Sequence, residues 1–170
     1  MSRNENRNDN GDAVRQTEDF IVPDRASTML VCIHGGREAG IYGDICSCYL
    51  KDAVKFEGAG DLVLKLDRIC SWLGAPCSKA EPRFLNGDME KQYQTMAAAP
   101  LEIIRDKQMG GLDQIPFHQA LQAREVLAVY IKFRENSSIQ GSIRGRLTGG
   151  KIVSFRSGLE LMRMLCMIQT

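Results

Sequence analysis

Two runs of alternating residues followed by a helix-start motif, all within residues 126–168, constrain the fold of this chain more than any other feature. In residues 129–133 apolar and polar side chains alternate, which is typical of a strand with one buried face. A second alternation covers residues 139–147, and a Gly149-Gly150 pair then predicts a hairpin turn before a third short strand. This stretch therefore predicts three antiparallel strands.

A helix is predicted directly after the third strand. The sequence Ser157-Gly158-Leu159-Glu160 has capping-box spacing, in which the serine hydroxyl accepts from a free helical amide and the glutamate reaches back to the cap. Leu161, Leu165 and Ile168 then form an apolar stripe at helical spacing. The predicted unit is β-β-β-α, with the helix covering the apolar face of a small antiparallel sheet.

A weaker copy of this pattern lies 98 residues upstream. Its matched pairs are Val31 with Val129, Ile33 with Ile131, Ile41 with Ile139, Gly43 with Gly141 and Ile45 with Ile143. After a turn that is one residue shorter, Asp61 and Leu62 fall on Glu160 and Leu161. We interpret the match as an internal duplication, because two small sheets that each need a covering helix can pack together.

The predicted fold class is therefore α+β, made of two related β-β-β-α units with a partly helical connector. The first unit is expected in residues 20–76, the connector in 77–125 and the second unit in 126–170. Residues 1–19 are polar and charged and have little to bury, so we expect a disordered tail.

The second unit also resembles a group of small proteins from clostridia and related Gram-positive bacteria, whose tails read approximately F-R-x-N-x-S-W-Q-G and then F-R-S-A-L-E-L-I. The matching residues here are Phe133, Arg134, Asn136, Ser138, Gln140, Gly141, Phe155, Arg156, Ser157, Leu159, Glu160 and Leu161. Ile139 stands in place of the aromatic residue and Gly158 in place of the alanine. The resemblance covers about a quarter of the chain and implies no activity.

Basic residues are concentrated in the second unit. Residues 126–170 contain seven basic and two acidic side chains, a balance of +5, whereas residues 28–73 have a balance of −1. Alternation predicts one sheet face that carries Tyr130, Lys132, Arg134, Arg144 and Arg146, with Lys151 and Arg156 at its rim. Such a face suits contacts with nucleic-acid phosphates, or alternatively an acidic protein partner or solvent alone.

The first unit offers a possible metal site. Cys32 and His34 share one side of its first predicted strand, and Cys46 and Cys48 share one side of the second. Three cysteines and one histidine form a ligand set that zinc accepts. The usual C-x₂-C spacing is absent, so the alternative interpretation is that the cysteines are small half-buried apolar residues and the histidine lies on the surface.

No motif in the sequence indicates catalysis, so we predict a non-enzymatic binding or regulatory protein that acts through its sheet faces. Its partner would be another protein or a second copy, and the alternative is a nucleic-acid-binding module that uses the basic face of the second unit. The sequence lacks an apolar run of membrane-spanning length or a signal-peptide core. Six cysteines without a disulfide framework fit the reducing cytoplasm.

Overall fold

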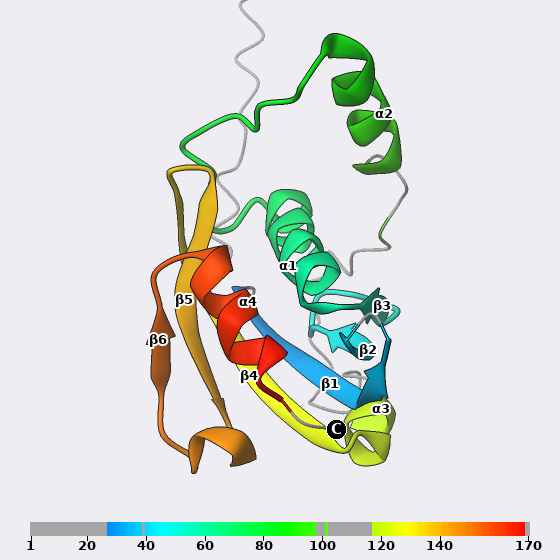
Figure 1. Cartoon of the computed structure of the whole chain (residues 1–170), viewed down its shortest axis with the longest axis vertical. Coiled ribbons are helices and arrows are strands. Elements are labelled where there is room, and N and C mark those ends of the chain that lie inside the picture. The colour runs from blue at the N-terminus through cyan, green and yellow to red at the C-terminus, as the bar shows by residue number, and fades with distance from the viewer. Residues whose placement is uncertain (1–26, 39, 98–100, 102–116, 169–170) are drawn as a thin grey trace, which may run out of the picture.

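The structure is a computed structural model, and it describes residues 27–38, 40–97, 101 and 117–168 (Figure 1). The predicted tail, residues 1–19, lies outside these residues. The strands are β1 (Thr28–Arg37), β2 (Gly40–Cys46), β3 (Val54–Glu57), β4 (Glu125–Glu135), β5 (Ser138–Gly145) and β6 (Val153–Phe155). The helices are α1 (Ala59–Leu73), α2 (Gly87–Ala97), α3 (Phe117–Gln122) and α4 (Gly158–Cys166), with the 3-10 helix η3 (Arg146–Thr148) after β5.

All six strands form one antiparallel sheet in the order β3-β2-β1-β4-β5-β6. The α+β class is thus confirmed, but the strands do not form two separate small sheets as predicted. The two groups of strands join through β1 and β4, where Met29 lies opposite Val129 and Val31 opposite Leu127. Backbone pairing between the central strands removes two edges that would otherwise be exposed.

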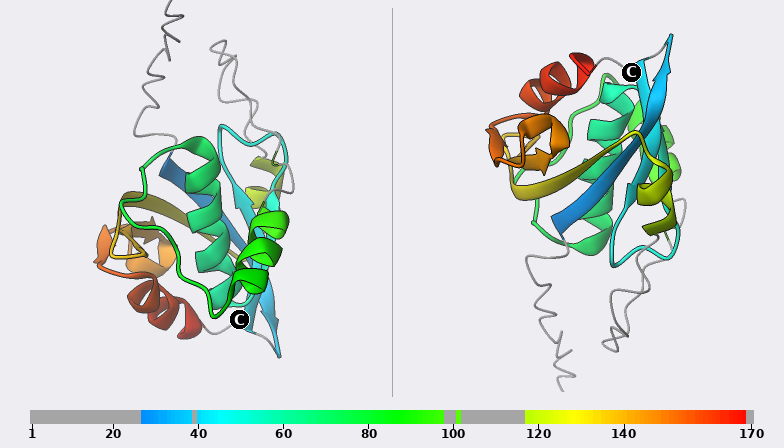
Figure 2. Two further views of the ribbon diagram at one scale, coloured as in Figure 1. Left: turned by 90° about the horizontal axis from the view of Figure 1, so that it is seen from above. Right: turned by 90° about the horizontal axis from the view of Figure 1, so that it is seen from below.

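Helices α1 and α4 cover the same face of the sheet (Figure 1), which we call the helix face. Val31 and Ile33 of β1, Ile131 of β4, Leu66 of α1 and Leu161 of α4 belong to the same buried core. We call the opposite side the rear face; it carries Leu30, Cys32, Asp44, Tyr130, Ser142 and Arg144. Helix α3 lies beside β1, close to the start of β4 (Figure 2).

A β-bulge interrupts each of the two central strands. The pairing register shifts between Ile33 and Gly35 in β1, and between Ile131 and Phe133 in β4. An extra residue in one strand reverses the alternation beyond it, because side chains point to opposite faces at every step. The predicted alternation of residues 129–134 is therefore wrong after Ile131: Phe133 turns to the rear face and Arg134 to the helix face.

A glycine lies opposite each strand at the last regular position before the bulge. Gly43 pairs with Ile33, and Gly141 pairs with Ile131. A Cβ atom at Gly43 would lie 1.9 Å from the carbonyl oxygen of Cys32, and one at Gly141 would lie 1.9 Å from that of Tyr130. Only a residue without a side chain fits there, so these glycines permit the close approach of the bulged strands.

Helix α4 begins with a modified form of the predicted capping box. Ser157 Oγ accepts from the amide of Glu160 at 3.1 Å, which confirms the serine half of the motif. The Glu160 carboxylate accepts from the amide of Arg156 at 2.6 Å, one residue before the amide expected for a capping box. The negative charge still lies in the first turn, where the helix dipole favours it.

Candidate functional site

Four of the seven residues predicted to form a basic sheet face lie on or next to the rear face. Tyr130 is half-buried there, and Lys132 is the exposed bulge residue, with its ammonium 5.1 Å from the centre of the Phe133 ring. Arg144 is exposed on β5 and donates from Nε to the carbonyl of Gly150 at 2.8 Å. Lys151 is exposed in the segment between η3 and β6.

The other three predicted residues are arginines that bind carboxylates of the same chain. Arg134 contacts Asp67 of α1, Arg146 contacts Glu125 and Arg156 contacts Glu160. Hydrogen bonds donated to Glu125 and Glu160 raise the pKa of Arg146 and that of Arg156. These cations are thus partly neutralised, and the predicted continuous basic face is reduced to Lys132, Arg144 and Lys151.

Arg134 is the clearest departure from the prediction. The residue as a whole is only 6% exposed, and its side chain lies on the helix face because the bulge before Phe133 reverses the alternation. Arg146 also departs from the predicted strand, since β5 ends at Gly145 and Arg146 opens the 3-10 helix. Neither arginine projects from the sheet beside Tyr130.

Phe133 is a rear-face residue that the sequence prediction assigned to the core. Its side chain is 47% exposed, and it lies opposite Gln140 on β5. The rear face of the second half therefore presents two aromatic rings, those of Tyr130 and Phe133, together with the cations of Lys132 and Arg144. Gly141 is the sequence feature that could have indicated the change, because a strand glycine often marks a bulge.

The four proposed zinc ligands separate into different environments. Cys32 and Cys46 are buried on the rear face and hydrogen-bond to each other, which lowers the pKa of Cys32 and raises that of Cys46. His34 pairs instead with Asp44, with 2.7 Å between Nε2 and Oδ2. Cys48 lies beyond the end of β2 and packs against the main core. Within the part of the chain that the structure describes, no three His, Cys, Asp or Glu side chains gather as a metal site would require.

A cavity of about 510 Å³ lies beside Arg134, between α1, the loop of residues 78–82, α2 and the β4–β5 turn. We call it the Arg134 pocket. The residues that matter for its chemistry are Asp67, Trp72, Lys79, Tyr93, Arg134 and Ser137. Its volume is within the range of small-molecule sites in proteins.

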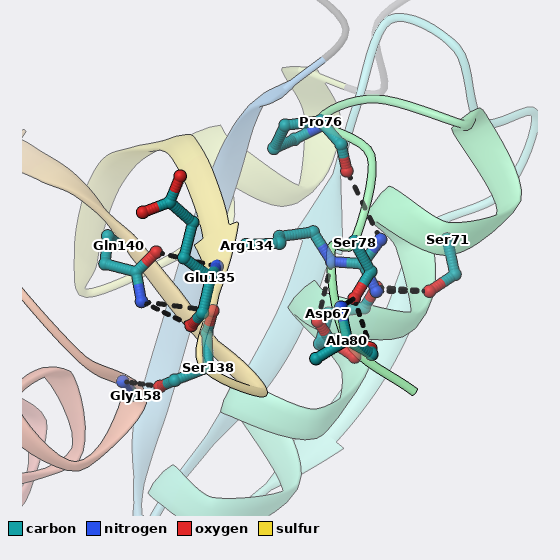
Figure 3. A network of polar contacts seen from close by, with 10 residues as sticks. All are labelled: Asp67, Ser71, Pro76, Ser78, Ala80, Arg134, Glu135, Ser138, Gln140 and Gly158. Carbon is teal, nitrogen blue, oxygen red and sulfur yellow. Dashed lines mark hydrogen bonds and ion pairs between the residues drawn. The ribbon is translucent and has the colours of Figure 1, made fainter. Parts of the chain in front are cut away.

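Three hydrogen bonds hold the Arg134 guanidinium at this pocket (Figure 3). Nε donates to Asp67 Oδ1 at 2.8 Å, Nη2 to Ser71 Oγ at 2.5 Å and Nη1 to the carbonyl of Pro76 at 3.3 Å. The backbone of Arg134 also accepts from the Lys79 amide at 3.3 Å, so the same residue fixes the loop that forms one wall. A buried arginine with these partners is a rigid part of the site.

No protein-family model matches the chain, and neither a curated protein nor a solved structure matches it. Among the described residues, no helix combines the length and apolar character needed to cross a bilayer.

Proposed function

We propose that the protein is a non-enzymatic binding protein that recognises a partner protein through the rear face of its second half. The contact surface would consist of Tyr130, Lys132, Phe133 and Arg144. The observation that carries this proposal is the half-exposed Phe133, which the bulge moves out of the core. An aromatic ring in that position contributes little to folding and is available for contact.

The composition of this surface fits a protein interface. Aromatic residues and arginine are enriched at interface centres, where they supply most of the binding energy. Within the described part of the chain, Lys132 and Arg144 form no ion pair with a carboxylate. We therefore expect a partner surface that combines an apolar group, to cover Phe133, with carboxylates for these two cations.

Single-stranded nucleic acid is the second candidate for the same surface. Unpaired bases stack on exposed aromatic rings, and neighbouring cations contact the phosphates. The rings of Tyr130 and Phe133 beside Lys132 and Arg144 favour this candidate. Nucleic acid ranks second because Arg146 and Arg156 already bind carboxylates and the whole chain carries a net charge of only +1.

We also infer that the two halves of the sheet are related units, as the repeat in the sequence predicts. Three local features that recur at corresponding positions support this. The bulges fall at His34 and Lys132, which are 98 positions apart. The strand opposite each bulge carries a glycine, Gly43 in the first half and Gly141 in the second. At the start of both helices a carboxylate accepts a hydrogen bond from the backbone amide four residues earlier. Asp61 accepts from the amide of Glu57 at 2.9 Å, and Glu160 accepts from the amide of Arg156 at 2.6 Å.

A site-specific photo-crosslinking amino acid at Phe133 tests the proposed surface in cells that produce the protein. The control position is Leu64 on α1, which is 60% exposed and lies away from the rear face. We expect a discrete protein adduct from position 133 and none of the same mass from position 64. An adduct of twice the chain mass would identify a second copy as the partner.

Charge reversal at the surface then tests its specificity. Lys132→Glu with Arg144→Glu should abolish the adduct formed from position 133. Lys91→Glu with Arg163→Glu makes the same change in net charge on exposed positions of α2 and α4 and should leave it intact. Nucleic acid in place of protein in the adduct, or equal adducts from both crosslinker positions, would overturn the proposal.

A further inference from the structure

We propose that the Arg134 pocket binds a neutral, hydroxylated ring of monosaccharide size. This site lies on the helix-face side of the molecule, so the inference is independent of the partner proposed for the rear face. It rests on the charge balance of the pocket, on its hydrogen-bonding groups and on its two aromatic side chains.

The ionised side chains that line the pocket nearly balance, with Arg68, Lys79 and Arg134 against Asp67 and Glu81, which argues against a strongly anionic ligand. The guanidinium of Arg134 already binds Asp67 at 2.8 Å, and the Lys79 ammonium binds Glu135 at 2.6 Å. A phosphate or carboxylate entering the pocket would compete with these carboxylates and would be repelled by Asp67. A neutral ligand leaves both ion pairs intact.

The polar groups match a ligand that both donates and accepts hydrogen bonds. A guanidinium has five N–H groups, and the hydrogen bonds of Arg134 within the described residues use three of them. Asp67 is bonded by Arg134 at Oδ1, and no described residue donates to its Oδ2. Adjacent hydroxyls on a sugar ring can accept from Arg134 and donate to Asp67 at the same time.

The aromatic side chains supply the other requirement of a sugar site. Trp72 of α1 and Tyr93 of α2 both line the cavity. One face of a pyranose ring exposes C–H groups, and these pack on the electron-rich face of an indole or phenol ring. The ring of Tyr93 also packs against that of Phe84, with 5.0 Å between the ring centres.

Ser137 places a hydroxyl at the pocket although its backbone lies in a strained conformation. It lines the cavity and has a φ angle of +54°, in the left-handed region that favours glycine. Asn136, the preceding turn residue, has a φ angle of +53°, so this is the turn type in which Asn-Gly is preferred. The hydroxyl forms no hydrogen bond with any described residue and is available to a ligand.

The fluorescence of Trp72 provides a direct assay, because it is the single tryptophan of the chain. The purified full chain is titrated with a panel of neutral monosaccharides and methyl glycosides, with inorganic phosphate and with a nucleoside monophosphate. We expect a saturable change in emission with at least one neutral sugar and none with phosphate. A response to phosphate or to the nucleotide alone would overturn the proposal, and so would no response to any compound.

Two variants connect the response to this pocket. Ser137→Gly relieves the strained backbone and preserves the turn, and it should weaken sugar binding by about threefold to tenfold through one lost hydrogen bond. Tyr93→Ala should weaken it further by removing a packing surface. Leu121→Ala, at an 86% exposed position of α3 outside the pocket lining, is the control and should bind as the unmodified protein does; equal affinity of all three variants would place binding elsewhere.

Discussion

Arg134 of β4 donates from Nε to Oδ1 of Asp67 on α1, with 2.8 Å between the two atoms. The pair joins the sheet of the second half to the helix of the first half. It exists because the bulge in β4 turns Arg134 toward the helix face. The two members differ in exposure: the arginine side chain is 7% exposed and the aspartate side chain 36%.

This difference predicts which member of the pair is more costly to replace. Asp67→Ala leaves a buried guanidinium without its counter-charge, whereas Arg134→Met leaves a carboxylate that water still reaches. We expect Asp67→Ala to lower the free energy of unfolding more than Arg134→Met, with a coupling energy of about 1–3 kcal/mol in the double variant. Urea denaturation of the two single variants and the double variant measures both quantities. The reverse order of the single variants would contradict the burial of Arg134.

Much of the local structure could be predicted from the sequence, because it depends on near neighbours. The strands, the serine cap at Ser157 and the α+β class follow from periodicity and capping rules. The orientation of Arg134 does not, because one extra residue in β4 reverses a face without a change in composition. The pairing of β1 with β4, and the ion pair of Arg146 with Glu125, depend on contacts between distant segments that no local pattern encodes.

The glycines opposite the bulges should be among the least replaceable residues of the sheet. Gly43→Ala and Gly141→Ala each place a Cβ atom against a backbone carbonyl oxygen, which cannot move without breaking the strand pairing. We expect each variant to lose about 3 kcal/mol or more of unfolding free energy. Gly87→Ala is the control, because nothing lies within 4 Å of its Cβ position. A large loss at only one of the two glycines would count against the inferred relation between the halves.

Two phenylalanines of the second half should respond in opposite ways to truncation. Phe155 is 2% exposed in the core, so Phe155→Ala should cost about 3–5 kcal/mol. Phe133 is 47% exposed on the rear face, so Phe133→Ala should change the unfolding free energy by less than about 1 kcal/mol. Denaturant titration of the two variants tests the bulge directly, since regular alternation from Val129 would make both truncations costly.

The cysteines should differ in reactivity according to their burial. Cys77 and Cys166 are exposed, whereas Cys32, Cys46 and Cys70 are buried. Brief treatment of the native protein with iodoacetamide at pH 8, followed by peptide mass spectrometry, should show labelling at the two exposed positions first. The buried three should react only after unfolding in urea. Rapid native labelling of Cys70 would show that α1 is not packed on the sheet as described.

Cys70 should also make stability depend on pH in the alkaline range. Burial raises the pKa of its thiol from an ordinary value of 9.0 to about 12. Above pH 9 the unfolded chain therefore releases a proton that the folded chain retains, so the free energy of unfolding falls as pH rises. The slope from one such group is at most about 1.4 kcal/mol per pH unit. A Cys70→Ala variant should be less stable at pH 7 but lose stability less steeply between pH 9 and pH 11. Equal slopes for the two proteins, measured by urea denaturation at each pH, would show that the Cys70 thiol ionises at the same pH in the folded and unfolded chains.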